Sequence, residues 1–126
     1  MVDITYLMAA VVEDGPTISL TDVLDTATAY SYVETTVAAD DTTEVDVHPG
    51  DAGDVVLFFM YSNVYDDLSY TVDGGGSIDF DAPVCLIGAG PAELLGATCN
   101  TLIFTNGSLT HDSLVRILVA WVAEDV

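Results

Sequence analysis

Negative charge spread along the whole chain is the feature that most restricts how this protein can fold. The chain has 21 carboxylates, from Asp3 to Asp125, against one basic side chain, Arg116, and its formal net charge is −20. At the same time 51% of its residues are hydrophobic, and the acidic residues are interleaved with apolar segments. Disordered acidic proteins combine high charge with a low apolar content. We therefore expect a folded chain that buries an apolar core and exposes an almost wholly negative surface.

The same composition indicates the solvent in which the protein works. Twenty uncompensated charges on a chain of 126 residues repel one another and oppose compaction. At molar salt the screening length falls to about 3 Å, and most of this repulsion disappears. The chain has 16 Asp, five Glu and no Lys, which is typical of a protein from a high-salt organism or its virus. A calcium-loaded extracellular module and an acidic mesophilic protein are the alternatives.

Charge and hydropathy also bear on partners and location. Binding to nucleic acid needs Lys and Arg to neutralise phosphates, and an anionic membrane surface repels an acidic chain. No stretch approaches the ~18 apolar residues of a membrane helix. The N-terminal segment lacks the positive region of a secretory signal and is interrupted by Asp3. We expect no nucleic acid or membrane partner, and a chain made in the cytoplasm without export.

Apolar and polar residues alternate with period 2, which is typical of strands. Residues 21–30 fit either a brief helix capped by Thr21 or a strand. Strands are predicted at residues 2–10, 17–20, 32–38, 43–48, 55–61, 67–73, 77–80, 84–87, 101–106 and 114–122. About eight to ten short strands, with turns every 8–12 residues and no long helix, predict an antiparallel β-sandwich or jelly roll. We expect one domain over residues 1–126, with residues 1–20 as a candidate docking strand or arm.

Local signals predict how some of these strands are connected. The acidic turn at residues 39–42 predicts a hairpin between residues 32–38 and 43–48, and the glycines at 74–76 predict another between 67–73 and 77–80. Residues 55–61 (VVLFFMY) are apolar on both faces, as expected of a strand that is covered on both sides.

Residues that could carry chemistry are few. His48 and His111 are the only histidines, the residue type that most often serves as a general base, and both are expected in exposed loops. We therefore expect no enzyme activity and no cofactor. Acidic pairs at residues 40–41, 51 with 54, 66–67, and 79 with 81 are candidate calcium ligands, with solvated surface as the preferred interpretation. Cys85 and Cys99 are expected to be buried free thiols, with a bridge between neighbouring strands as the alternative.

Arg116 and Asn106 have two interpretations each. Arg116 shares a strand face with Leu114 and Leu118 and is expected to form an ion pair, either within the chain or between subunits. Asn106 begins an Asn-Gly-Ser sequence, which matches the N-glycosylation pattern. A hairpin turn is the preferred interpretation of this sequence because no export signal is seen.

Residues 43–122 carry a resemblance to a known class of proteins. They contain the hydrophobic strand at 55–61, the segment LSYTVDGGGSI at 68–78, DAPVCLI at 81–87, TLIFTNGS at 101–108 and VRILVAWV at 115–122. In this order of strand, glycine turn and "TNGS" segment, the chain resembles small β-sandwich virion proteins of tailed viruses, such as head-decoration, turret and tail-attachment proteins. With its acidity, the resemblance implies a non-enzymatic structural protein on the capsid surface or tail of a haloarchaeal virus particle.

The resemblance also implies partners. These are other virion proteins, with further copies of the chain in a trimer or another symmetric oligomer. We expect docking through an edge strand or arm, with Tyr6, Met8 and Val11 of the apolar N-terminal strand, and Arg116, at the interface. The rival hypotheses are a cell-surface or soluble carbohydrate- or calcium-binding β-sandwich and, third, a hydrolase that uses His48 or His111.

The charge leads to a first testable prediction. Thermal stability should rise steeply between roughly 0.1 M and molar salt, because screening removes the self-repulsion of the carboxylates. Melting temperatures measured by circular dichroism across this range check it. A flat profile would contradict the interpretation of the chain as halophilic.

Overall fold

The structure of the chain is a computed structural model that describes residues 3–25, 27–47, 54–88, 91 and 101–122. The all-β class predicted from the sequence is confirmed. The secondary structure elements are β1 (Ile4–Val11), β2 (Thr17–Leu24), β3 (Ala29–Val37), β4 (Asp41–Asp46), β5 (Asp54–Ser62), β6 (Leu68–Val72), β7 (Ile78–Asp79), β8 (Val84–Ile87), β9 (Thr101–Asn106) and β10 (Ser113–Val122).

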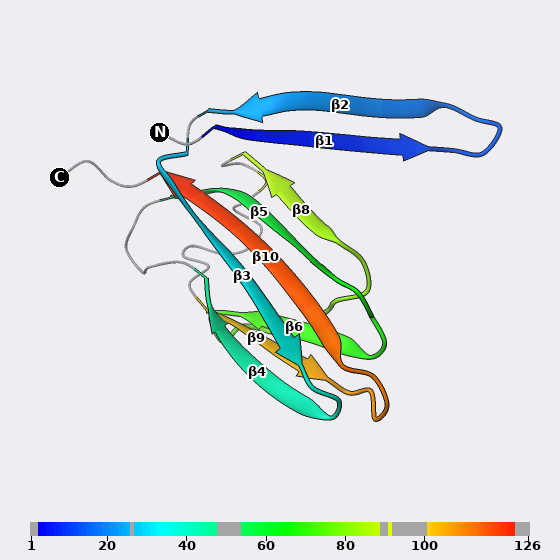
Figure 1. The fold of residues 1–126 in the computed structure, drawn as a ribbon, viewed down its shortest axis with the longest axis vertical. Helices are drawn as coiled ribbons and strands as arrows, with labels where there is room; N and C mark the ends of the chain where they lie inside the picture. Colours follow the sequence, from blue (N-terminus) through cyan, green and yellow to red (C-terminus); the bar gives the residue numbers. More distant parts are fainter. Residues whose placement is uncertain (1–2, 26, 48–53, 89–90, 92–100, 123–126) are drawn as a thin grey trace.

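Eight of these strands form two antiparallel sheets that pack as a sandwich (Figure 1). One sheet has the order β3-β10-β5-β8, and the other has the order β4-β9-β6-β7. Consecutive strands from β3 onward lie in opposite sheets, except that β6 and β7 are neighbours in the same sheet. The predicted antiparallel β-sandwich is therefore confirmed, with a core built from residues that are distant in sequence.

The core lies between the two sheets and is filled by alternate residues of each strand. Along β10 the inward side chains Val115, Ile117 and Val119 are fully buried. At the centre, the Phe80 ring lies 5.3 Å from the ring of Tyr65, 5.6 Å from that of Tyr70 and 6.0 Å from that of Phe104, measured between centroids. Aromatic pairs at such spacings add to the stabilisation that comes from area burial alone.

Two of the predicted connections are wrong. The turn at Asp40, which has a φ of 55°, does not close a hairpin, because β3 pairs with β10 and β4 pairs with β9. The predicted hairpin turn at Asn106 is also wrong. Asn106 ends β9 in one sheet, and the next strand, β10, belongs to the other sheet. The hairpin of β6 and β7 is confirmed, with Ser69 opposite Asp79. In the ambiguous stretch at 21–30, residues 21–24 continue β2, and no helix forms among the described residues.

Strands β1 and β2 form a separate two-stranded sheet, which we call the arm. Its base packs on the sandwich, where Ile4 and Leu24 contact a buried cluster that contains Leu57 and Ala120. Its far end projects past β8, away from the body of the molecule (Figure 1). The predicted candidate arm at residues 1–20 thus corresponds to a complete hairpin that runs from residue 4 to residue 24.

The aromatic cluster provides a second prediction. Replacing Phe80 by Ala should lower the free energy of unfolding by about 3–5 kcal/mol, because the change leaves a cavity among three rings. The matched control is Ile78→Ala in the same segment, whose side chain is exposed and which should cost about 0.5 kcal/mol. Urea denaturation at molar salt measures both. Similar losses for the two variants would show that the cluster is not the centre of the core.

Candidate functional site

The outer faces of the two sheets differ in chemistry. The outward side chains of the β4-β9-β6-β7 sheet are hydroxyls and carboxylates with a single aliphatic residue: Thr42, Glu44, Asp46, Ser69, Thr71, Asp79, Thr101, Ile103 and Thr105. They bond to one another across strands, as in the 3.1 Å hydrogen bond that Thr101 Oγ1 donates to Asp46 Oδ1. This is the face of a sheet that lies against water.

The outer face of the β3-β10-β5-β8 sheet is mainly apolar and aromatic. Its side chains form three rows across the strands: Glu34, Arg116 and Tyr61; Tyr32, Leu118, Phe59 and Cys85; and Tyr30, Ala120, Leu57 and Ile87. One carboxylate and the only arginine of the chain are its charged groups, so the rows have no net charge. We call this surface the neutral face.

The two charged groups of the neutral face neutralise each other. Arg116 Nε donates a hydrogen bond of 3.2 Å to Glu34 Oε1, and Arg116 Nη1 donates one of 3.1 Å to the hydroxyl of Tyr61. Tyr32 donates a 2.6 Å hydrogen bond to the same Glu34 oxygen. That bond raises the pKa of Tyr32 and, with help from Arg116, lowers the pKa of Glu34. The ion pair of Arg116 therefore forms within the chain.

Aromatic rings on this face remain partly in water. Tyr30 is 55% exposed, Tyr32 is 52% exposed and Phe59 is 37% exposed. The strand β5 was expected to be covered on both sides, and its inward residues Phe58 and Met60 are indeed fully buried. On its outward side, Leu57 is buried beneath the base of the arm and Phe59 is covered only in part, so the prediction holds for the inner side and for part of the outer side. Tyr30 and Tyr32 were not predicted as surface residues, although their spacing of two places them on one strand face.

The base of the arm lies over part of the neutral face and leaves a cleft of about 310 Å³ between them. Residues 4–8 form one wall, and Leu57, Phe59 and Leu118 belong to the other. The sulfur atoms of Met8 and Cys85 are 4.0 Å apart across it. Partial burial raises the pKa of the Cys85 thiol. Cys85 is a free cysteine, and Cys99 lies outside the described residues.

The four predicted interface residues lie in or near this region. Tyr6 and Met8 line the cleft, with Tyr6 half-buried. Val11 lies at the far end of the arm and is 71% exposed. Arg116 lies on the neutral face, beside Tyr61. The structure thus places all four on the arm or on the neutral face, and their role in an interface stays a prediction.

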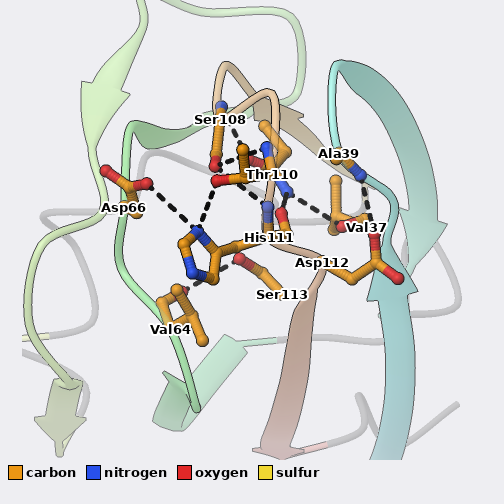
Figure 2. Close-up of polar contacts among 10 residues, drawn as sticks. Val37, Ala39, Val64, Asp66, Ser108, Thr110, His111, Asp112 and Ser113 are labelled. Atoms are coloured by element: carbon orange, nitrogen blue, oxygen red, sulfur yellow. Dashed lines mark hydrogen bonds and ion pairs between the residues drawn. The ribbon is translucent and has the colours of Figure 1, made fainter.

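Loops at one end of the sandwich form a dense polar network (Figure 2). Asn106 is only 1% exposed, and its Nδ2 donates to the carbonyls of Val37, at 3.0 Å, and His111, at 2.8 Å. Its Oδ1 accepts a bond from the amide of Ser108. Asp112 accepts a 2.9 Å bond from the amide of Ala39. The amide of Asn106 is therefore committed inside the fold and is not available to carry a glycan in the folded chain.

His111 lies beside a hydroxyl and a carboxylate, but their arrangement differs from a catalytic triad. Its Nδ1 is 2.8 Å from Thr110 Oγ1 and 3.6 Å from Asp66 Oδ2 (Figure 2). In a triad the hydroxyl and the carboxylate bind opposite ring nitrogens, so that the ring can pass a proton between them. Here both groups approach the same nitrogen. The side chain is 57% exposed, as expected for a loop histidine, whereas His48 lies outside the described residues.

Several of the acidic pairs proposed as calcium ligands have roles in turns. Asp40 and Asp67 adopt positive φ angles of 55°, a conformation that Asp tolerates better than most residues. Asp41 Oδ1 accepts a bond from the amide of Thr42. Among the described residues, no group of three or more His, Cys, Asp and Glu side chains could hold a metal ion. Asp51 lies outside them.

In the part of the chain that the structure describes, no helix is long and apolar enough to cross a membrane. Comparison with protein families, with curated proteins and with solved structures finds no match to this chain. The geometry of the neutral face and the arm is therefore the basis for assigning a function.

The polar network leads to a third prediction. Asn106→Asp should lower the free energy of unfolding by about 2–4 kcal/mol, because a carboxylate would face two carbonyl oxygens without a donor. The control Asn63→Asp adds the same charge at an exposed site, where the side-chain oxygen still accepts from Leu114, and should cost about 0.5 kcal/mol. Urea denaturation at molar salt compares them. Equal losses would mean that added charge, and not the lost donor, is responsible.

Proposed function

We propose that this chain is a non-enzymatic structural protein of a virus particle, on the capsid surface or the tail, from a high-salt environment. The neutral face carries this proposal, because it is a broad apolar surface on an otherwise acidic molecule. Contiguous exposed apolar patches on soluble proteins mark sites of interaction. The partners are other virion proteins and further copies of the chain.

The chemistry of the neutral face favours a protein partner over a small ligand. Specific small-molecule sites combine an apolar cavity with a few free polar groups that orient the ligand. Around the cleft, the hydroxyls of Tyr32 and Tyr61 are already bonded to Glu34 and Arg116. Aromatic side chains and Arg, by contrast, are enriched in protein interfaces, and the face presents three such rings around one Arg.

The strand order supports the same proposal. From β3 to β10 it has eight strands in two four-stranded sheets, with one hairpin and all other consecutive strands in opposite sheets. We infer that this order is that of a jelly roll, an architecture used by viral capsid proteins and also by lectins. Fold alone does not define function. The strand order therefore supports the proposed virion role, but the neutral face remains its main basis.

Incorporation into particles tests the proposal. Virus particles are purified at high salt from the organism that produces the chain, and their composition is measured by mass spectrometry. We expect the chain in a fixed copy number per particle, and portal, capsid and tail genes beside its own gene. A chain that is absent from particles and monomeric in the soluble fraction would contradict the proposal.

A pair of variants makes this fourth prediction specific to the neutral face. Phe59→Glu places a carboxylate among the exposed rings and should reduce incorporation by tenfold or more, because the charge must lose its water in any contact (about 1.4 kcal/mol per factor of ten). Thr105→Glu adds the same charge to the polar outer face of the other sheet and should leave incorporation unchanged. Melting temperatures at molar salt verify that both variants fold.

A carbohydrate-binding sandwich is the second candidate, because Tyr30 and Tyr32 are exposed side by side on a sheet face. It predicts that Tyr32→Ala abolishes the retardation of the chain in polysaccharide gels while leaving its association state unchanged. The virion proposal predicts that the wild-type chain is not retarded in such gels.

A further inference from the structure

We propose that the distal half of the arm lies on the neutral face of a second copy of the chain. The inference rests on the proposed role of the neutral face as a contact surface, and it names the group that fills it. Among the sheets that the structure describes, the arm lacks a core of its own.

The arm is a ribbon that its own molecule covers only at the base. A two-stranded hairpin alone is marginally stable in water. Every residue from Leu7 to Val23 is exposed among those described in its two strands, including Leu7 and Ile18 at 73% each. Both outer edges of the ribbon are free of strand pairing within the described residues. Such a ribbon is stabilised most by a surface that buries the apolar side chains on one of its sides.

That apolar side is continuous from the base to the tip. Tyr6 and Met8 point into the cleft, and alternation places Ile4 and Ala10 on the same side of β1. Their partners across the hairpin are Leu24, Asp22, Leu20 and Ile18. We call this set the inner stripe of the arm. The same stripe that packs on the sandwich at Ile4 and Leu24 continues past the cleft, and its distal residues Leu20 and Ile18 are exposed.

Charge identifies a second copy as the occupant. At −20, two copies repel each other wherever carboxylates face carboxylates. The inner stripe carries one acid, Asp22, and the neutral face carries none that is uncompensated, since Glu34 is paired with Arg116. Asp22 lies opposite Tyr6 near the base, so the distal half of the stripe carries no acid, and its contact with a neutral face buries no uncompensated charge. Within each copy, the base of the arm already packs on the neutral face of the same chain. The inner stripe and the neutral face are therefore able to pack together.

The receiving surface is the part of the neutral face that its own arm leaves open. Tyr30, Tyr32 and Phe59 are the exposed rings there. Tyrosine is enriched among the residues that dominate binding energy at protein interfaces. A stable interface takes about 20–30 residues a side. In a reciprocal pair, each copy would contribute the distal half of its arm and the eleven side chains of its three rows, and so approach this size.

The fifth prediction uses two neighbouring residues of β2 that point to opposite sides of the ribbon. Ile18 belongs to the inner stripe and Ser19 does not. At molar salt, light scattering should give the wild-type chain the mass of an oligomer, which is at least twice the 13.3 kDa of one chain. Ile18→Asp should raise the dissociation constant about 100-fold or more, because an unpaired carboxylate is buried. Ser19→Asp adds the same charge and should leave the oligomer intact. Melting temperatures identify any unfolded variant.

A mixture of two variants tests whether the arm of one copy binds the neutral face of another. Ile18→Asp changes the distal arm, and Phe59→Glu changes the face, where Phe59 also lines the cleft at the base of the arm. A mixture of the two should form a 1:1 complex that neither variant forms alone, and melting temperatures verify that both variants fold. No complex in the mixture would overturn the inference, and so would equal damage by Ser19→Asp and Ile18→Asp. An oligomer of Phe59→Glu alone would indicate arm-to-arm contact, and an oligomer of Ile18→Asp alone would indicate face-to-face contact.

The two proposals can fail separately. A wild-type chain that is monomeric at molar salt, yet present in purified particles, would overturn the arm contact and leave the virion role standing. An oligomer that depends on Ile18 and Phe59, in a chain that is absent from particles, would support the arm contact and overturn the virion role.

Discussion

Repulsion between carboxylates decides which surfaces of this molecule can be brought into contact with another protein. Burying an unpaired carboxylate costs several kcal/mol, so an interface on most of this surface would have to desolvate many such groups or supply basic partners for them. The outer side of the β4-β9-β6-β7 sheet, with Glu44, Asp46 and a set of hydroxyls, is of this kind. The neutral face is not, because the only arginine is placed there and pairs with the only acid of its rows. The position of Arg116 thus matters beyond one ion pair.

Exposed pairs of this kind contribute little to stability in general. The ion pair matters here for the charge of the surface. Arg116 neutralises Glu34, so the apolar face of the four-stranded sheet carries no net charge. Tyr32 and Tyr61 complete the arrangement, since each bonds to one member of the pair and keeps its ring on the face. Glu34, Arg116 and the hydroxyls of Tyr32 and Tyr61 are therefore bonded to one another before any partner arrives.

The sequence predicted the elements better than their pairing. The strands, the β6–β7 hairpin and the sandwich class follow from local alternation and turns, and these were correct. The supposed hairpin between β3 and β4 was wrong, because a tight turn at Asp40 serves equally well to join two strands of one sheet or to cross between sheets. Which of the two occurs is decided by partners such as β9 and β10, which lie more than fifty residues further along the chain.

Only single residues of the candidate site could be predicted, because their contacts also depend on residues that are distant in sequence. Arg116 was singled out because it is unique, yet its partner could have been any of 21 acids until the register placed Glu34 opposite it. The sequence Asn-Gly-Ser fits a glycosylation site as well as a structural loop, and only the burial of Asn106 between two carbonyls separates them. For β5, an apolar pattern on both faces shows that something covers the outer side. It does not distinguish the arm of the same chain from that of a neighbour.

Salt links the folding of this chain to its assembly. Screening at molar salt shortens the range of repulsion to about 3 Å, which relieves the sandwich and the contact between copies alike. Excluded salts also strengthen the burial of apolar surface, on which the inner stripe of the arm depends more than the sandwich, since it has no core of its own. As salt is diluted, the arm should therefore leave its partner before the sandwich unfolds. The cluster around Phe80 is held by contacts within one copy, whereas the proposed contact would cover the distal arm with the face of another copy.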